Sequence, residues 1–250
     1  MCIRDRGDTA LAKKFSQDIG LIKEVGINPI IVHGGGPQIG KMLKKKNIKT
    51  KFVEGLRITD KKTVKVVEKV LSKDINKKIV SDINLTGGKA ESFSGNINNL
   101  IQAKKLKIAI KESDSNIERI LDLGFVGEPT KINIKKILIS IKNGKIPVIA
   151  PLGIDKNGNT YNINADTVAG AVAGALKASK LLLLTDVDGI LDQNNKLISS
   201  LSYKEALKIY KKKYISGGMK PKISTCIEAI SNGVNAVSYT HLTLPTIYSV

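Results

Sequence analysis

Short apolar runs alternate with longer amphipathic stretches along most of this chain, and this alternation limits what the chain can fold into. The runs at 29–33, 146–151 and 234–237, and the one that begins 180–191, are rich in Ile, Val and Leu. Strands this short and this apolar are typical of parallel sheets that are covered on both faces. The alternation therefore predicts an α/β protein with helices on both sides of a parallel sheet.

The stretches between the apolar runs carry helical patterns. Apolar residues recur at helical spacing in 9–25, and Gly26 then suits a helix C-cap. Further helices are predicted at 37–46, 63–83, 165–179, 202–210 and 222–233. A chain of 250 residues is long enough for one large domain or for two lobes, and no internal repeat or low-complexity linker divides it.

The chain is strongly basic, with a formal net charge of +19 from 41 Lys and Arg against 22 Asp and Glu. Nucleic-acid binding usually combines a basic patch with interleaved aromatic side chains. Here the lysines are spread over the whole chain, and only 4% of the residues are aromatic. The pattern favours solvated lysines on helix faces and no nucleic-acid partner. A nucleic-acid binder stays an alternative, which a steep salt dependence of affinity would identify.

Membrane and secretion signals are not recognisable. No run approaches the roughly 18 apolar residues that a membrane helix needs, and no apolar segment of a signal peptide follows Met1. The two cysteines, Cys2 and Cys226, suggest neither a disulfide framework nor a metal site. We therefore expect a cytoplasmic protein with no membrane partner and no metal bound by the protein itself.

Three consecutive glycines, Gly34 to Gly36, join a predicted strand to a predicted helix. Ligands of parallel sheets bind at the carboxyl ends of the strands. Glycines there let backbone N–H groups approach an anion, and the helix N-terminus adds a positive potential. The motif favours a cradle for a phosphate or an oxyanion, although it matches neither a P-loop nor G-x-G-x-x-G. By itself it is equally compatible with a plain strand-to-helix turn.

Three other stretches contain residues suited to binding an anionic substrate. Arg57 lies in a polar stretch after a predicted strand, and arginine is the usual bidentate partner of a carboxylate. Asn162, Asn164 and Asp166 lie where a loop enters a helix, and Asn164 suits the N-cap of that helix. Lys222 follows a pair of glycines, which is also compatible with a surface turn that carries solvated lysines.

Taken together, these motifs resemble a known family. The segments "IVHGGGPQIG", "VEGLRITD", "YNINADTVAG", "LLLLTDVDGIL" and "ISGGMKPKI" stand in the order and spacing of the acetylglutamate kinases, a branch of the amino acid kinase family. The resemblance covers roughly residues 7–237. It implies a three-layer αβα sandwich with a mainly parallel central sheet. It also implies an N-terminal lobe at 7–163 for the amino acid and a C-terminal lobe at 164–237 for the nucleotide.

The resemblance implies a reaction as well. ATP would phosphorylate the side-chain carboxylate of N-acetyl-L-glutamate to give N-acetyl-L-glutamyl 5-phosphate, a step of arginine biosynthesis. Mg²⁺ would arrive with ATP, and no permanent cofactor is implied. The nucleotide would contact Thr185, Asp186, Val187, Asp188, Gly189, Ile190, Leu191, Tyr214, Ile215 and Ser216.

The other implied site residues come from four of the quoted segments. Gly34 and Gly35 match positions that bind the substrate and the transferring phosphoryl group. Arg57 matches the residue that holds the α-carboxylate, and Asn162 matches one that contacts the acetylamino group. Lys222 is implied to stabilise the transition state, and Asp166 to organise the catalytic lysines.

Two rival functions remain open at this point. One is a kinase that acts on a carrier-bound aminoadipate or glutamate, which competition with free N-acetylglutamate would distinguish. The other is a catalytically inactive relative that binds ATP or an amino acid without turnover. The resemblance further implies a homodimer or a higher homo-oligomer.

The two ends of the chain depart from the family pattern. The family begins with a strand that ends in Lys-x-Gly-Gly, and "MCIRDR" at 1–6 stands in its place. Residues 238–250 contain no Lys, Arg, Asp or Glu and do not continue the family pattern. We expect both ends to be non-native, and the first strand and the C-terminal part of the fold to be missing. Because a transition-state lysine would be lost, we expect slower turnover than in an intact relative.

Overall fold

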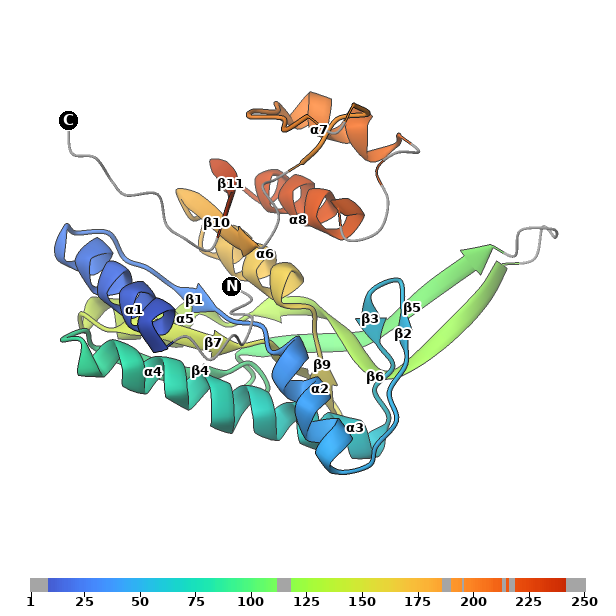
Figure 1. Cartoon of the computed structure of the whole chain (residues 1–250), viewed down its shortest axis with the longest axis horizontal. Coiled ribbons are helices and arrows are strands. Elements are labelled where there is room, and N and C mark those ends of the chain that lie inside the picture. The colour runs from blue at the N-terminus through green and yellow to red at the C-terminus, as the bar shows by residue number, and fades with distance from the viewer. Residues whose placement is uncertain are drawn as a thin grey trace.

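A parallel sheet forms the centre of the computed structural model, which describes residues 9–111, 118–185, 190–194, 196–212, 215 and 219–241 (Figure 1). Its strands are β1 (Ile31–Val32), β7 (Ile146–Ala150) and β4 (Ala90–Ser94), in the order β1-β7-β4. Both pairings are parallel. All five residues of β7 are buried, as expected for a strand that is covered on both faces.

Helices cover this sheet on both sides. Helices α1 (Thr9–Glu24) and α4 (Asn76–Leu85) pack on one face, and α5 (Ile134–Lys142) and α6 (Ala165–Ala175) pack on the other. Neighbouring strand residues point to opposite faces. Val148 therefore joins the core beneath α1 and α4, whereas Ile149 joins the core beneath α5 and α6. The three-layer αβα prediction is confirmed.

A long helical stretch crosses the molecule beside the sheet. It consists of α3 (Lys61–Glu68), the π-helical segment η1 (Lys69–Ile75) and α4, where the sequence predicts one helix at 63–83. Asp60 caps its start, because the Asp60 carboxylate accepts a hydrogen bond from the Thr63 N–H at 2.7 Å. The predicted C-cap at Gly26 is also confirmed, since this residue has a φ of +91° after α1.

A second sheet extends away from the central one (Figure 1). Strands β5 (Ile101–Lys111) and β6 (Glu118–Ile132) form a long antiparallel arm, and β8 (Leu152–Ile154) and β9 (Thr160–Asn162) close its base into a small barrel. The sequence analysis identifies none of these four strands. A short hairpin of β2 (Phe52–Val53) and β3 (Leu56–Arg57) lies beside the arm.

The C-terminal part contains the remaining elements. Strand β10 (Lys180–Thr185) pairs in parallel with β11 (Ala236–His241), and α7 (Tyr203–Tyr210) and α8 (Met219–Ser231) lie between them in sequence. The predicted strand at 234–237 is wrong by two residues at its start, because the Val234 N–H still bonds the Ala229 carbonyl of α8. Strand β11 runs on to His241, into the stretch predicted to be non-native. Residues 1–6 and 242–250 lie outside the described part.

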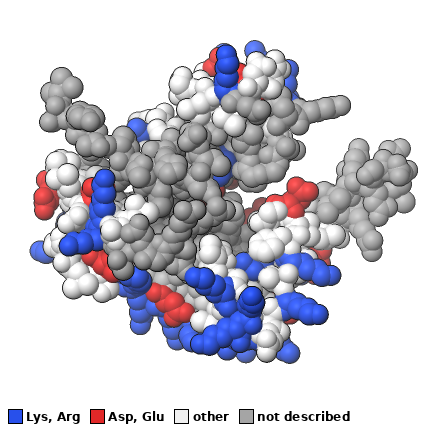
Figure 2. Space-filling view, viewed as in Figure 1, with Lys and Arg blue, Asp and Glu red and all other residues white. Residues whose placement is uncertain are grey.

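Basic and acidic side chains are interspersed on the face of the molecule that Figure 2 shows. Figure 2 shows Lys and Arg along the lower edge of the molecule, with Asp and Glu among them. None of the helices that the structure describes is long and apolar enough to cross a membrane.

Candidate active site

The three glycines lie at the carboxyl end of β1, where the chain turns into α2 (Gly36–Lys45). Pro37 occupies the first turn of this helix, as predicted. The N-cap residue is Gly35, so no side chain satisfies the first N–H groups of α2. Backbone donors at an uncapped helix N-terminus are available to an anion. The geometry is therefore compatible with the predicted anion cradle.

The glycines of this loop have different surroundings. A Cβ added to Gly35 would lie 2.5 Å from Ile75 Cδ1 and 2.8 Å from Leu71 Cδ2, whereas a Cβ on Gly36 would meet no described atom within 4 Å. Gly35 is buried and Gly36 is exposed. The sequence analysis explains these glycines by ligand approach or by a plain strand-to-helix turn. For Gly35, close packing against η1 is a second reason for the missing side chain.

Arg57 lies against the glycine loop. Its Nη2 donates to the Gly36 carbonyl at 3.1 Å, and its Nη1 donates to Thr50 Oγ1 at 3.2 Å. The guanidinium carbon is 4.5 Å from the centre of the Phe52 ring, within the range of a cation–π contact. The turn between β2 and β3 contains two positive-φ residues, Glu54 and Gly55, which allow the tight hairpin that places Arg57 here.

Burial affects the charge of this arginine only slightly. Arg57 is 8% exposed, and desolvation by burial lowers the pKa of its guanidinium. An arginine remains protonated at neutral pH even so. The site therefore holds a fixed cation, whose planar donors suit a carboxylate, beside the uncapped end of α2.

Asn162 is linked to the Arg57 segment through Thr59. The Thr59 hydroxyl, which is completely buried, donates to the Arg57 carbonyl at 2.8 Å and accepts from Asn162 Nδ2 at 3.4 Å. Thr59 is held in turn by the arm, because its N–H bonds the Leu123 carbonyl. The structure thus brings Gly36, Arg57 and Asn162 into one connected group.

Asp166 and Lys222 form an ion pair between two helices. Lys222 Nζ lies 3.3 Å from Asp166 Oδ2, and the two side chains are 22% and 27% exposed, respectively. Asp166 is in the first turn of α6, and Lys222 is in the first turn of α8. Asn164 is the N-cap of α6, with its Oδ1 accepting from the Thr167 N–H at 3.0 Å, as the sequence predicts. The contact fits a carboxylate that holds a lysine in place.

The predicted nucleotide residues are described only in part. Thr185 ends β10, Leu191 pairs with Leu197 in an isolated bridge, and the Ile190 carbonyl accepts from the Ile198 N–H. Ile215 is buried, with 3% of its surface exposed. Asp186, Val187, Asp188, Gly189, Tyr214 and Ser216 lie outside the described residues.

Two residues that the sequence analysis does not single out lie directly behind the glycine loop. His33 and Asn76 are 1% and 0% exposed, and they hydrogen-bond each other at 3.1 Å between His33 Nε2 and Asn76 Nδ2. His33 could have been identified from the sequence, because it directly precedes the three glycines in the "HGGGPQ" motif. Asn76 reads as an ordinary polar residue of a helix and carries no such signal.

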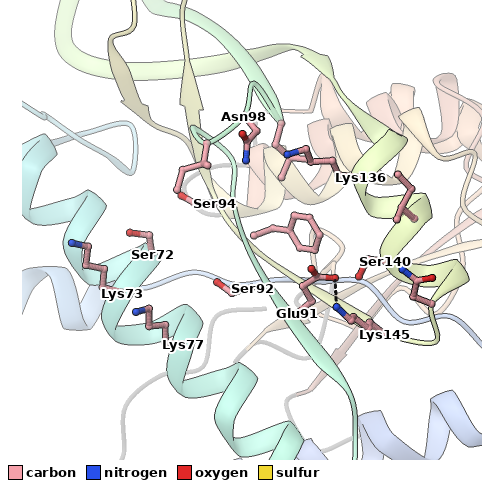
Figure 3. A pocket seen from close by; sticks show the side chains of 15 residues that line it. Ser72, Lys73, Lys77, Glu91, Ser92, Ser94, Asn98, Lys136, Ser140 and Lys145 are labelled. Carbon is pink, nitrogen blue, oxygen red and sulfur yellow. Dashed lines mark ion pairs between the residues drawn. The ribbon is translucent and has the colours of Figure 1, made fainter.

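A separate pocket lies along β4, between the η1–α4 helix and α5 (Figure 3). Its lining includes an ion pair between Glu91 and Lys145 at 3.4 Å. None of the residues that line it belongs to the predicted site. The candidate active site is therefore the group around the glycine loop, and not this pocket.

Comparison with known proteins identifies the family to which this fold and sequence correspond. The model of the amino acid kinase family matches residues 2–238. Acetylglutamate kinase from Parvibaculum lavamentivorans is 54% identical over 92% of this chain and 76% of its own length. The enzyme of the same name from Agrobacterium fabrum is also 54% identical, over 92% and 79%. The crystal structure of smu.665 from Streptococcus mutans superposes with a TM-score of 0.78 at 29% identity, covering 92% of this chain and 93% of that one.

Proposed function

We propose that this chain, which belongs to the amino acid kinase family, transfers the γ-phosphoryl group of ATP to the side-chain carboxylate of N-acetyl-L-glutamate in arginine biosynthesis. The predicted resemblance to this family and its fold is confirmed. The observation that carries the substrate assignment is the pair of acetylglutamate kinases that are 54% identical over 92% of the chain. The placement of Arg57 at the glycine loop supports it.

The chemistry requires positive charge more than it requires a base. A carboxylate is ionised near neutral pH, so no group has to remove a proton from the acceptor. The obstacle is the repulsion between the carboxylate and the phosphates of ATP. Donors and cations along the path of transfer reduce this repulsion most in the transition state. Mg²⁺, which enters as part of the ATP substrate, neutralises phosphate charge.

We assign the substrate-binding roles as follows. The Arg57 guanidinium binds the α-carboxylate of the amino acid, and Asn162 contacts the acetylamino group. The N–H groups of Gly34 and Gly35 bind the substrate and the transferring phosphoryl group. The 3.1 Å contact between Arg57 and the Gly36 carbonyl supports this assignment, because it holds the carboxylate-binding cation beside the loop.

We assign phosphoryl transfer itself to Lys222, held by Asp166. The ammonium group stabilises negative charge on the transferring group, and the carboxylate fixes its position through the 3.3 Å ion pair. Thr185–Leu191 and Tyr214–Ser216 bind the nucleotide in a lobe at 164–237, and residues 7–163 bind the amino acid. We further propose a cytoplasmic homodimer or higher homo-oligomer, which light scattering after size-exclusion chromatography would test.

The experiment that tests this function measures ADP formation from MgATP, with N-acetyl-L-glutamate and L-glutamate supplied in parallel. We expect turnover with the acetylated acid only. Equal turnover with plain glutamate, or a preference for a carrier-linked acid in competition, would refute the substrate assignment. Nucleotide binding without any turnover would point to an inactive relative.

Three variants test the residue assignments. Arg57→Lys keeps the charge but loses the planar fork, so we expect the KM for N-acetylglutamate to rise roughly tenfold or more while the KM for ATP changes little. Asp166→Asn should lower kcat by about 10²-fold. Lys78→Met is the matched control, because it removes an exposed ion pair of 2.8 Å with Asp82 on α4 and should leave turnover unchanged. An Asp166→Asn enzyme as fast as this control would refute the role of Asp166 in holding Lys222.

A further inference from the structure

His33 lies at the start of the glycine loop but contacts its backbone from behind. It is buried at the end of β1, and its backbone N–H donates to the Ile149 carbonyl of β7. Its Nδ1 lies 3.0 Å from the Gly34 carbonyl oxygen. A carbonyl oxygen only accepts hydrogen bonds, so this contact places a proton on Nδ1.

The other ring nitrogen is then left as an acceptor. A neutral imidazole with a proton on Nδ1 has an unprotonated Nε2, and this atom accepts from Asn76 Nδ2 at 3.1 Å. Desolvation by burial lowers the pKa of His33 to about 4, so the ring is neutral at physiological pH. The protonation of the ring and the direction of both hydrogen bonds are mutually consistent.

Asn76 is itself fixed by the central sheet. Its Nδ2 also donates to the Val148 carbonyl of β7 at 2.9 Å, and its Oδ1 accepts from the Ser92 hydroxyl of β4. These contacts decide which side of the amide faces His33. The Asn76 amide therefore connects the glycine loop to two strands of the sheet.

The orientation of the Gly34 carbonyl decides where the next N–H points. In a trans peptide the C=O and the N–H of one plane point in opposite directions. The Gly34 carbonyl and the Gly35 N–H share one peptide plane. Because the carbonyl points towards the buried His33 ring, the Gly35 N–H points away from it.

We propose that His33 and Asn76 are positioning residues for phosphoryl transfer, which hold the Gly34–Gly35 peptide so that the Gly35 N–H is directed at the transferring phosphoryl group. Neither side chain touches the substrate in this arrangement. The inference rests on the proposed function for the identity of the ligand. The hydrogen-bond pattern that it requires can be tested without any substrate.

The first test observes the imidazole directly. The chain contains two histidines, so a ¹⁵N-histidine sample gives two ring systems, and the His33→Asn variant assigns them. We expect His33 to show a protonated Nδ1 and an unprotonated Nε2 between pH 6 and 8. A proton on Nε2 instead would overturn the inference, whatever the enzyme phosphorylates.

The second test compares two substitutions of His33. Asparagine retains an N–H donor near the position of Nδ1, whereas leucine has a similar size but no donor. For His33→Leu we expect kcat to fall roughly 10²-fold, the loss typical of one misplaced donor, with little change in the KM for N-acetylglutamate. His33→Asn should recover most of this kcat although it leaves a larger cavity. Unfolding curves of both variants establish that each is folded at the assay temperature.

The outcomes separate the two proposals. Equal kcat values for His33→Leu and wild type, or equal losses in both variants, would overturn the positioning role. If the wild-type chain has no turnover, the proposed function fails and MgATP binding decides the inference. His33→Leu should then bind MgATP roughly tenfold more weakly than His33→Asn, and equal affinities would overturn it. If neither His33 variant folds, Ser92→Ala is used instead, because it removes the hydroxyl that donates to Asn76 Oδ1. An unchanged kcat would then count against the inference.

Discussion

Gly35 and Gly36 form a matched pair of positions for testing how the glycine loop is packed. Alanine at position 35 would place its Cβ 2.5 Å from Ile75 Cδ1, whereas carbon atoms in contact are usually about 3.5–4.0 Å apart. The φ of Gly35 is 178°, so its extended backbone accepts alanine and the cost is crowding alone. Crowding of a packed core typically costs about 1–3 kcal/mol, and replacing glycine recovers about 0.4–1 kcal/mol through the unfolded chain. We expect Gly35→Ala to lower the free energy of unfolding by roughly 1–2 kcal/mol.

Urea denaturation followed by circular dichroism measures this change, provided that the m-value stays constant. Gly36→Ala is the control, since no described atom lies within 4 Å of its added Cβ, and it should be neutral or up to about 1 kcal/mol more stable. Ile75→Val deletes the atom that is crowded. Alone it should cost about 0.5–1.5 kcal/mol, and in the Gly35→Ala protein it should cost less. If Gly35→Ala is as stable as Gly36→Ala, or if the changes at positions 35 and 75 simply add, the packing argument is wrong.

Three further predictions concern stability. The pKa of buried His33 is about 4 in the folded chain and 6.5 in the unfolded chain, so the unfolded state binds more protons between these two pH values. The free energy of unfolding should therefore fall by on the order of 2 kcal/mol from pH 7.5 to pH 5. His33→Asn should remove this pH dependence. Gly124→Ala should lower the free energy of unfolding, measured by urea titration, by at least about 2 kcal/mol, because the φ of Gly124 is +75° and the added Cβ would overlap the Thr59 carbonyl. Gly144→Ala is the control: Gly144 has a φ of +72° in open space, so the substitution should cost only about 1 kcal/mol. Asn164→Ala should lower the free energy of unfolding, measured by urea titration, by about 1 kcal/mol through loss of the α6 N-cap, and Asn164→Asp should restore it.

The periodic parts of this fold could be predicted from the sequence. The helix expected at 9–25 is α1 at Thr9–Glu24, and the strand expected at 146–151 is β7 at Ile146–Ala150. In both cases the pattern of apolar side chains ends next to a residue that caps or breaks the element, so the two signals agree on the boundary. The burial of such segments is decided locally, so local reasoning is sufficient for them.

The strands between residues 90 and 132 could not be predicted in this way. Register shifts between Gln102 and Ala103, and between Lys105 and Lys107, interrupt the alternation that would identify β5. Strand β4 reads "AESFS", which has too few apolar residues to stand out. Its place in the sheet is decided by parallel pairing with β7, which is distant in sequence. Pairing of this kind is not visible in local periodicity.

The candidate site likewise contains local features that the sequence predicts and long-range contacts that it does not. The glycine loop and the Asn164 cap are local features, and both could be read from the residues. The pairing of Asp166 with Lys222 spans 56 positions and was implied only by the family resemblance. The contact between Arg57 and the Gly36 carbonyl is not predicted by the sequence, because it depends on where the β2–β3 hairpin places the Arg57 side chain relative to α2.

The π-helical segment η1 explains why the sequence does not reveal the contacts of Leu71 and Asn76 that support the glycine loop. The sequence predicts one regular helix at 63–83, in which residues five apart lie on different faces. In η1 the Asn76 N–H bonds the Leu71 carbonyl, an i to i+5 hydrogen bond that widens the turn. Leu71 can then pack against Gly35 while Asn76 reaches His33, so two residues on one side of the same turn support neighbouring peptides of the loop. A search for helical periodicity assigns those two residues to different surroundings, and only the hydrogen bonding of the wide turn brings them together.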